Sequence, residues 1–409
     1  MTDEARGRSH PGLLHDLLLQ RSTVVVCGPG GVGKTTTAAS VAASVAASRP
    51  AKVLVLTIDP ARRLADALGL ADLGNSETRV PGELFAPSTD RPRGELWAAM
   101  LDTGQAWDHL VRAHAPDPAS AAKLLANPLY RNISTRFVQS HDYIAAERLL
   151  ELHDSGRFDL IVVDTPPSRH AVDFLLAPDR MADFFSSRLL RWLLVPYRSR
   201  WSAMASRPFT QIADRVLGTV LLKEVSEFFT LIQAMHSGFT ERAKAVSGLL
   251  RDFSTTFMVV TTLEAGPRAE AAELMRVLCS MELELGAVVF NKVLPRSLLD
   301  PAQQPSAAAM ESEAERLASD LSTSEGLDEL LVARVLREVG ASFLQYRQLA
   351  LREERQAELL PIGDAVCSVV PYFGSDVTDL GGLLRLGEAM MSTTCGRSRG
   401  GHPAPAAAR

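Results

Sequence analysis

The sequence contains little lysine, little cysteine and no long apolar run. Only six of its 43 basic residues are lysines, so a lysine within a glycine-rich loop indicates a specific role. Its four cysteines lie far apart and form no C-x-x-C pair, which disfavours a zinc ribbon, a thioredoxin-like site and a secreted disulfide framework. About 18 successive apolar residues are needed to cross a membrane, and no stretch of that length lacks charged residues. We therefore expect no transmembrane segment.

The first residues, MTDEARGRSHPGLL, also lack the apolar core of a signal peptide. We therefore expect a soluble, cytoplasmic protein. Its residues 1–10 are predicted to form a loose leader. Residues 392–409, rich in Gly, Ala and Arg, are predicted to form a disordered tail.

What is present suits a large folded core. The 409 residues are 46% hydrophobic and 22% charged, a composition that excludes a disordered chain. At roughly 150 residues per domain, this length predicts two to three domains, or one large α/β unit with an insertion. The net charge of −5 disfavours a protein whose main task is to hold nucleic acid by charge, so we expect no nucleic-acid partner.

Short apolar, β-branched runs alternate with helical stretches along the chain. Several of these runs show no alternation of apolar and polar residues, which indicates strands covered by helices on both faces, as in a parallel sheet. The predicted fold class is therefore α/β, with a doubly wound, mostly parallel sheet. The expected strands are 23–27, 53–58, 95–101, 160–164, 256–260, 287–291 and 366–370.

Residues 105–155 and 179–250 carry helical periodicity and almost no strand signal. They predict a helical subdomain inserted between strands. A third helical piece, 306–357, has apolar residues spaced by three and four and is expected to form an exposed arm within the core. The remaining α/β core is expected to comprise 11–104, 156–178 and 251–391.

A phosphate-binding loop follows the first expected strand. Residues 28–35, GPGGVGKT, match G-x-x-x-x-G-K-[ST], and an alanine-rich helical stretch comes next. Glycines let successive backbone N–H groups surround phosphates, and the start of a helix adds positive potential. Lys34 supplies a mobile charge, and the Thr35 hydroxyl is a ligand for Mg²⁺. The motif predicts a nucleoside triphosphate held by Gly28, Gly30, Gly31, Val32, Gly33, Lys34, Thr35 and Thr36.

Two acidic residues stand at the ends of expected strands, where ligands bind in open α/β sheets. Asp59 is suited to orient the water that attacks the terminal phosphate; the alternative is a helix cap, with Pro60 at the first helical position. Asp164 ends an apolar run in a Walker B pattern and is expected to hold Mg²⁺ through a water, the alternative being a turn residue. His170 is either part of a switch or a locally hydrogen-bonded side chain.

Taken together, these loops resemble the ArsA family of ATPases, which includes the arsenical-pump ATPase and the guided-entry ATPase that targets tail-anchored membrane proteins. The resemblance spans most of residues 20–391. Its specific pieces are GPGGVGKTTTAA (28–39), TIDPARRLADALG (57–69), FDLIVVDTPPSRHAVDFLLAP (158–178) and FNKVLP (290–295).

The resemblance implies a P-loop fold and a dimeric, ATP-hydrolysing protein in which two switch loops couple nucleotide state to dimer shape. It implies that Asp59 positions the catalytic water, that Asp164 belongs to the second switch and that Asn291 recognises adenine. The expected catalytic residues are Lys34 and Asp59. The expected switch residues are Asp59, Pro60, Arg62, Asp164 and His170.

The phosphate loop departs from the family pattern at one position. The usual loop, K-G-G-x-G-K-[ST], carries a first lysine that reaches the partner subunit's phosphates, and this chain has Pro29 there. Because proline offers neither a charge nor an N–H group, it cannot donate that cation. Either Arg62 or Arg63 substitutes, or a paralogous subunit supplies the lysine. We favour the paralogue, so the assembly is expected to be a homodimer or a heterodimer of that kind.

Two further departures concern switching and metals. Arg169 stands where a glycine is usual in the second switch, which restricts the backbone there. The C-x-x-C pair that bridges the eukaryotic targeting dimer through zinc is absent, and no cysteine cluster suits a soft metalloid. Arsenite transport is therefore disfavoured.

An apolar stripe in the second helical segment is a candidate client site. It predicts either a groove for a hydrophobic client, such as a membrane-protein segment, or the packed interior of a helical subdomain. Three functions stay open: an ATPase that loads and releases such a client, a weakly active regulatory ATP-binding subunit, and a positioning ATPase for DNA or membranes. Net charge and tail composition disfavour the third. The stripe comprises Phe184, Phe185, Leu189, Leu190, Trp192, Leu193, Leu194, Val195, Trp201 and Met204.

Overall fold

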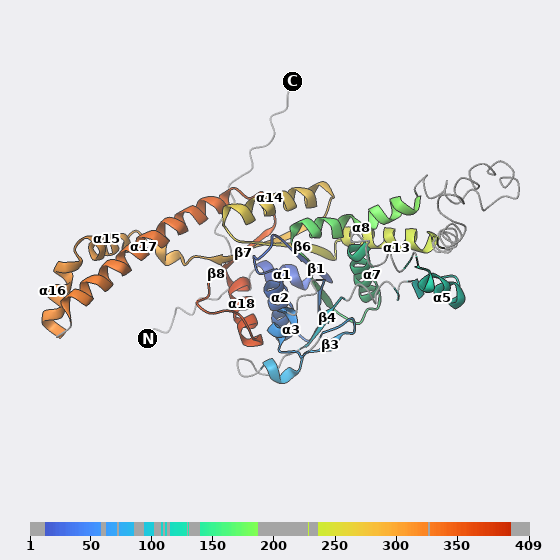
Figure 1. The fold of residues 1–409 in the computed structure, drawn as a ribbon, viewed down its shortest axis with the longest axis horizontal. Coiled ribbons are helices and arrows are strands. Elements are labelled where there is room, and N and C mark those ends of the chain that lie inside the picture. Colours follow the sequence, from blue (N-terminus) through green and yellow to red (C-terminus); the bar gives the residue numbers. More distant parts are fainter. Residues whose placement is uncertain are drawn as a thin grey trace, which may run out of the picture.

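One sheet lies at the centre of the molecule (Figure 1). Within the described residues it has eight strands, in the order β3-β4-β2-β5-β1-β6-β7-β8. All neighbouring strands are parallel except β3 and β4, which are antiparallel. The computed structural model describes residues 13–58, 63–71, 73–85, 94–101, 108, 111–112, 115–128, 130, 140–186, 228, 236–325 and 328–393.

The seven strands expected from the sequence are present, each within two residues of its expected ends. The sequence does not signal β3, because two residues carry no apolar pattern. The strands are β1 (Thr23–Cys27), β2 (Lys52–Thr57), β3 (Thr78–Arg79), β4 (Glu95–Met100), β5 (Leu160–Asp164), β6 (Thr255–Thr261), β7 (Leu285–Val293) and β8 (Val366–Pro371).

Alternate residues of β1 enter two different cores. Val24 and Val26 pack in a cluster with one set of helices, whereas Val25 and Cys27 pack in a cluster with another set. Because both faces are covered, every residue of β1 is buried, which explains its continuous apolar run. The predicted doubly wound α/β class is thereby confirmed.

Helices from the two ends of the chain cover the first face of the sheet, and helices from its middle cover the second. The first set is α1 (Leu13–Leu19), α2 (Lys34–Ser48), α3 (Arg63–Leu68) and α18 (Leu380–Ser392). The second set is α7 (Ser140–Asp154), α8 (Ser168–Ser186), α13 (His236–Arg251) and α14 (Ala265–Ser280). Further elements are α5 (Pro118–Ala126) and the 3-10 helices η1 (Gly82–Phe85) and η2 (Arg296–Leu299).

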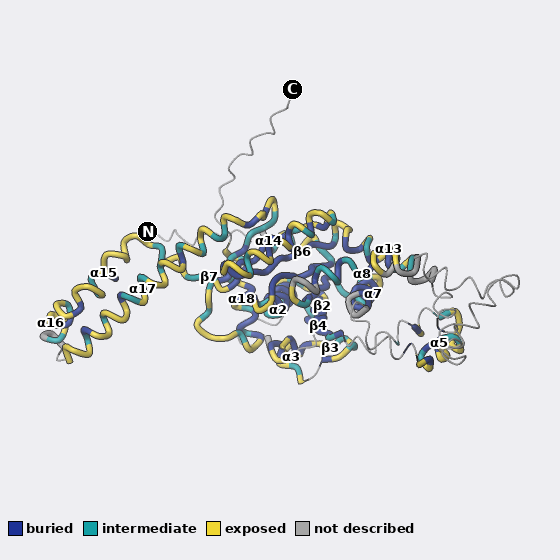
Figure 2. The backbone as a smooth tube through the Cα atoms, turned by 45° about the horizontal axis from the view of Figure 1, so that its top comes forward, coloured by how far each residue is buried: buried dark blue, intermediate teal, exposed yellow. Residues whose placement is uncertain are grey.

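Three helices extend away from the sheet: α15 (Gln303–Ser312), α16 (Ala314–Glu325) and α17 (Glu329–Glu358) (Figure 1). The longest of them, α17, begins at the cap residue Asp328, whose carboxylate accepts a hydrogen bond from the backbone N–H of Leu330 at 2.9 Å. Gly340 lets α17 approach α15 closely, because a Cβ there would lie 2.5 Å from the carbonyl oxygen of Ala307. Figure 2 shows that exposed residues predominate along these helices, in contrast to the sheet. No helix in the described part of the chain is both long and apolar enough to cross a membrane.

Candidate functional site

The loop between β1 and α2 is held in a backbone shape that only glycine adopts readily. Gly28, Gly31 and Gly33 have φ angles of 149°, 77° and 93°, a region that other residues rarely enter. A Cβ at Gly28 would overlap the carbonyl oxygen of Val260, and one at Gly33 would overlap the side-chain amide of Asn291. The glycines are therefore required by backbone angle and by close packing, as a phosphate loop demands.

The start of α2 is free of a side-chain cap. Gly33 stands at the cap position and offers no side-chain hydrogen bond, so the first backbone N–H groups of the helix are left for a ligand. Ten of the 15 residues of α2 are buried, which holds the helix and its N-terminus firmly against the sheet. Oriented N–H groups with the helix dipole behind them form an anion site.

Lys34 is the first residue of α2 and is only 8% exposed. Its ammonium group donates a hydrogen bond to the carbonyl oxygen of Pro29 at 2.7 Å. The charge thus lies over the loop that the glycines shape. At the end of β1, burial raises the pKa of the Cys27 thiol to about 12, although the charge of Lys34 opposes the rise. Cys27 therefore stays a neutral thiol and acts as a packing residue.

Asp164 ends β5 beside the end of β2 and is fully buried. The hydroxyl of Thr57 donates to its carboxylate at 3.0 Å, and the two residues are register partners in the sheet. The next residue, Thr165, donates its hydroxyl to the carbonyl oxygen of Val26 at 2.9 Å. The segment that leaves β5 is thus fastened to the strand that precedes the phosphate loop. Sequence reasoning missed Thr57, whose only signal is its place at the carboxyl end of a strand.

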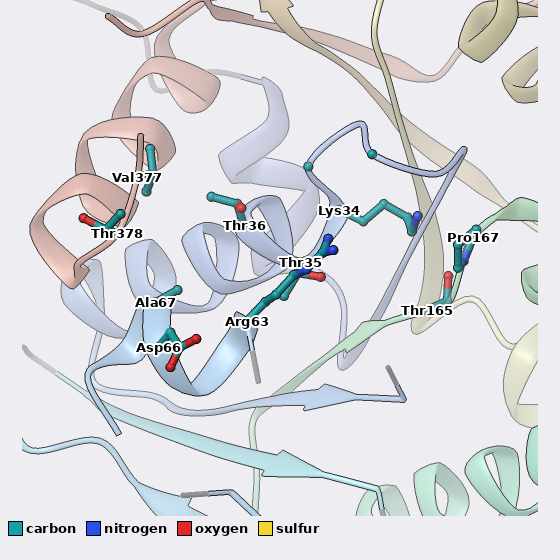
Figure 3. Close-up of a pocket in the computed structure, with 12 residues that line it drawn as sticks. Lys34, Thr35, Thr36, Arg63, Asp66, Ala67, Thr165, Pro167, Val377 and Thr378 are labelled. Carbon is teal, nitrogen blue, oxygen red and sulfur yellow. The ribbon is translucent and has the colours of Figure 1, made fainter. Parts of the chain in front are cut away.

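A cavity of about 370 Å³ opens over the loop (Figure 3). Its volume falls within the range of small-molecule sites. It brings together the phosphate loop, the segment after β5, the start of α3 and the turn before α18. The sequence predicted the first two, and it named Arg63 at the start of α3 as one of two candidate substitutes for the missing lysine; the turn before α18 was not expected. The lining residues are Gly31, Gly33, Lys34, Thr35, Thr36, Arg63, Asp66, Ala67, Thr165, Pro167, Val377 and Thr378.

Five other predicted site residues, namely Gly28, Gly30, Val32, Asp164 and Asn291, do not line this cavity. Asn291, buried at the end of β7, donates its side-chain amide to the carbonyl oxygen of Val32 at 2.8 Å and accepts from the backbone N–H of Lys292 at 2.9 Å. It therefore braces the phosphate loop.

Several predicted residues fall where the structure gives no description. Asp59, Pro60 and Arg62 lie outside the described residues. His170 and Arg169 belong to α8, but their side chains are not described. The same holds for Phe184 and Phe185, and the rest of the apolar stripe up to Met204 lies outside the described residues.

The residues present fit a nucleotide with Mg²⁺. The Thr35 hydroxyl and the Asp164 carboxylate are hard oxygen donors of the kind that Mg²⁺ prefers. The described residues contain no group of three or more His, Cys, Asp or Glu side chains that could hold a metal ion by themselves.

The chain is similar to known ATPases over most of its length. The model of the ArsA ATPase family, described as anion-transporting ATPase, matches residues 21–319. The ATPase get3 of Schizosaccharomyces japonicus is 27% identical over 297 residues, which cover 71% of this chain and 80% of that protein. An uncharacterized protein of Streptomyces coelicolor is 32% identical over 279 residues, 67% of this chain and 63% of that protein. The ATPase asna-1 of Caenorhabditis elegans is 25% identical over 276 residues, 66% of this chain and 74% of that protein. This chain therefore belongs to the ArsA family of ATPases.

Proposed function

We propose that this protein is a dimeric switch that binds and hydrolyses ATP and couples turnover to the binding of a hydrophobic client or partner. The observation that carries the proposal is the glycine-shaped loop whose Lys34, Thr35 and Thr36 line one cavity with Thr165 and Pro167. A triphosphate there would meet the loop N–H groups and the helix start on one side and the segment after β5 on the other. The remaining roles, water positioning by Asp59 and adenine recognition by Asn291, belong to the proposal.

Lys34 would contact the phosphates directly. In the structure its ammonium donates to the Pro29 carbonyl. Phosphate oxygens are stronger acceptors for an ammonium than a neutral carbonyl is, so nucleotide binding is expected to draw Lys34 from that carbonyl. The backbone N–H groups that open α2 stabilise the charge that develops during phosphoryl transfer.

Thr35 and Asp164 would hold Mg²⁺, which neutralises phosphate charge when bound. The Thr57 hydroxyl orients the Asp164 carboxylate from the protein side. Because Asp164 is buried and its strand is register-paired with β2, the carboxylate is held in place before the nucleotide arrives.

The segment after β5 links the site to the helices that the client would use. A Cβ placed on Gly30 would lie 3.9 Å from the Cβ of Pro167, so the phosphate loop and this segment are neighbours. The segment leads directly into α8, which packs against α7 and α13. Loss of the terminal phosphate would therefore act on α8 through Thr165 and Pro167, and α8 leads into the apolar stripe.

Titration calorimetry with magnesium-ATP and a turnover assay on the purified chain test the proposal. We expect saturable heat and phosphate release, both lost in Lys34→Ala. Native mass with and without magnesium-ATP tests the dimer. Absence of binding by well-folded protein would refute the proposal at its base.

Pro29 favours a second function, a weakly active regulatory subunit that works with a paralogue carrying the loop lysine. That reading predicts binding of ATP with little turnover until the paralogue is added. Full activity of this chain alone would exclude it.

A further inference from the structure

Arg63 places a second cation at the nucleotide cavity. It is the first residue of α3 and lines the same cavity as Lys34, Thr35 and Thr36. In Figure 3 its side chain extends from α3 toward the phosphate loop. Among the described residues that line this cavity, Lys34 and Arg63 are the ones with positive side chains.

The guanidinium of Arg63 has no ion pair or hydrogen bond with any residue that the structure describes. Two arginines near the second core, in contrast, form ion pairs. Arg148 pairs with Glu77 at 2.6 Å, and Arg242 pairs with the buried Glu147 at 2.7 Å. Asp66 lines the same cavity one turn along α3, yet no ion pair joins it to Arg63. Arg63 is thus a cation available to a ligand.

The packing of α3 fixes where Arg63 stands. Leu64, Ala65, Ala67 and Leu68 are buried in the first core, so the helix cannot turn about its axis, and Arg63 is directed to the cavity. The backbone from which the Arg63 side chain reaches the cavity is therefore fixed before the ligand arrives.

We propose that Arg63 contacts the terminal phosphate of the bound triphosphate, from within the same subunit, and stabilises the charge that develops during its transfer. The planar guanidinium presents a fork of N–H donors that matches phosphate oxygens. Pro29 of the phosphate loop has neither charge nor N–H to offer; in this proposal Arg63 supplies the second positive charge that phosphoryl transfer favours. This inference rests on the proposed function of the cavity.

The test compares the affinities of Arg63→Ala and wild type for two ligands, magnesium-ADP alone and magnesium-ADP with aluminium fluoride, by calorimetry. We expect the substitution to weaken the aluminium fluoride complex at least about tenfold while leaving the magnesium-ADP affinity within about threefold. Arg63→Lys should recover part of the loss, because it keeps the charge without the fork. Lys52→Ala, an exposed cation at the other end of β2, is the matched control and should change neither affinity.

A mixing experiment then establishes from which subunit the cation comes. Arg63→Ala and Lys34→Ala are combined and their turnover is assayed. If Arg63 acts within its own subunit, every site lacks one cation and the mixture stays inactive. Recovered activity would show that the arginine reaches a neighbouring site and would overturn the inference. An equal loss of both affinities, or no loss, in Arg63→Ala would also overturn it, whereas a wild type that binds no magnesium-ADP would refute the proposed function instead.

Discussion

Helices α2 and α17 differ in how many of their residues are buried. In α2, ten of 15 residues are buried, and after Lys34 no side chain is larger than valine. In α17, which has 30 residues, only Ala333, Gly340 and Ala350 are buried. Small side chains let α2 lie close to the sheet along its length, whereas α17 is buried only at a few small residues where it meets α15, α16 and, near its C-terminal end, η2. Burial is therefore extensive along α2, whose N-terminus forms the proposed phosphate site, and sparse along α17.

The outer side of α17 illustrates the contrast further. Large apolar side chains remain exposed there, together with charged residues such as Arg334 and Glu338, which form an ion pair at 3.0 Å. An exposed pair of this kind contributes little to stability. The exposed apolar side chains are Leu330, Leu331, Val335, Val339, Tyr346 and Leu349. Substitutions on the two helices should therefore differ sharply in effect.

The largest difference is expected between a cation on α2 and a cation on α17. Lys34→Ala removes the charge at the phosphate loop and should lower ATP turnover at least about 100-fold. Arg334→Ala removes a charge from an exposed ion pair and should leave turnover unchanged and alter the unfolding free energy by less than about 0.5 kcal/mol. Steady-state ATPase assays and urea unfolding of both variants check this. Equal ATP turnover by Lys34→Ala and Arg334→Ala would contradict this prediction.

Next come two glycines at tight contacts, one in the loop before α2 and one in α17. Gly28→Ala adds a methyl group that overlaps the Val260 carbonyl at a φ of 149°, and it should cost about 3 kcal/mol or more and abolish ATP binding. Gly340→Ala also meets a backbone oxygen, but the gain in helix propensity offsets part of the strain, so we expect a cost of about 1 kcal/mol with ATP binding retained. Thermal unfolding and magnesium-ATP titration measure both effects. Loss of ATP binding in Gly340→Ala would show that the projecting helices govern the site.

A buried and an exposed polar contact provide the third comparison. Thr57→Val removes the hydroxyl that donates to the buried Asp164 and should cost about 1–3 kcal/mol. It should also raise the Mg²⁺ concentration needed for half-maximal ATP binding. Thr57→Ser keeps the donor and serves as the control. Arg337→Ala removes the exposed pair with Glu315 and should leave the urea midpoint almost unchanged, because solvent screens such a pair. If Thr57→Val left the Mg²⁺ dependence of ATP binding unchanged, the proposed role of Thr57 in the site would be wrong.

The smallest effect is expected where α17 joins the body. Burial, and secondarily the charge of Glu264, raise the pKa of Glu353 above that of an ordinary glutamate, although a backbone hydrogen bond from Leu294 opposes the shift. Because the folded pKa is raised, the stabilising contribution of Glu353 is complete below the ordinary glutamate pKa and declines as pH rises through the folded value. Glu353→Gln stays neutral and still accepts from Leu294, so it should remove this small decline in urea midpoints measured from about pH 4 to pH 8. Glu354→Gln, an exposed neighbour, should not.

Periodicity and local motifs predicted the sheet well and the cavity only partly. The segments that form β1 and β5 are apolar because helices cover both faces of the sheet there, and such segments can be recognised in the sequence alone. The loop glycines, Lys34 and Thr35 follow from a motif whose spacing reflects backbone geometry. The sequence did not assign Thr57 to the site and offered Arg63 only as one of two substitutes for the missing lysine, because contact between β2, α3 and the loop arises only when the sheet assembles. The expected role of Asn291 came from family resemblance, while its bond to Val32 is a tertiary contact.

By itself, the sequence determined seven of the eight described strands, the phosphate loop and the family of this protein, since these depend on neighbours along the chain. Tertiary structure alone decided which side chains from distant segments share one cavity, namely those of α3, the segment after β5 and the turn before α18. The physical reason is that parallel strands bring their carboxyl ends to one edge regardless of separation in sequence. Lys34, Arg63 and Thr165 thus line one cavity, of which the local motif describes only the phosphate loop.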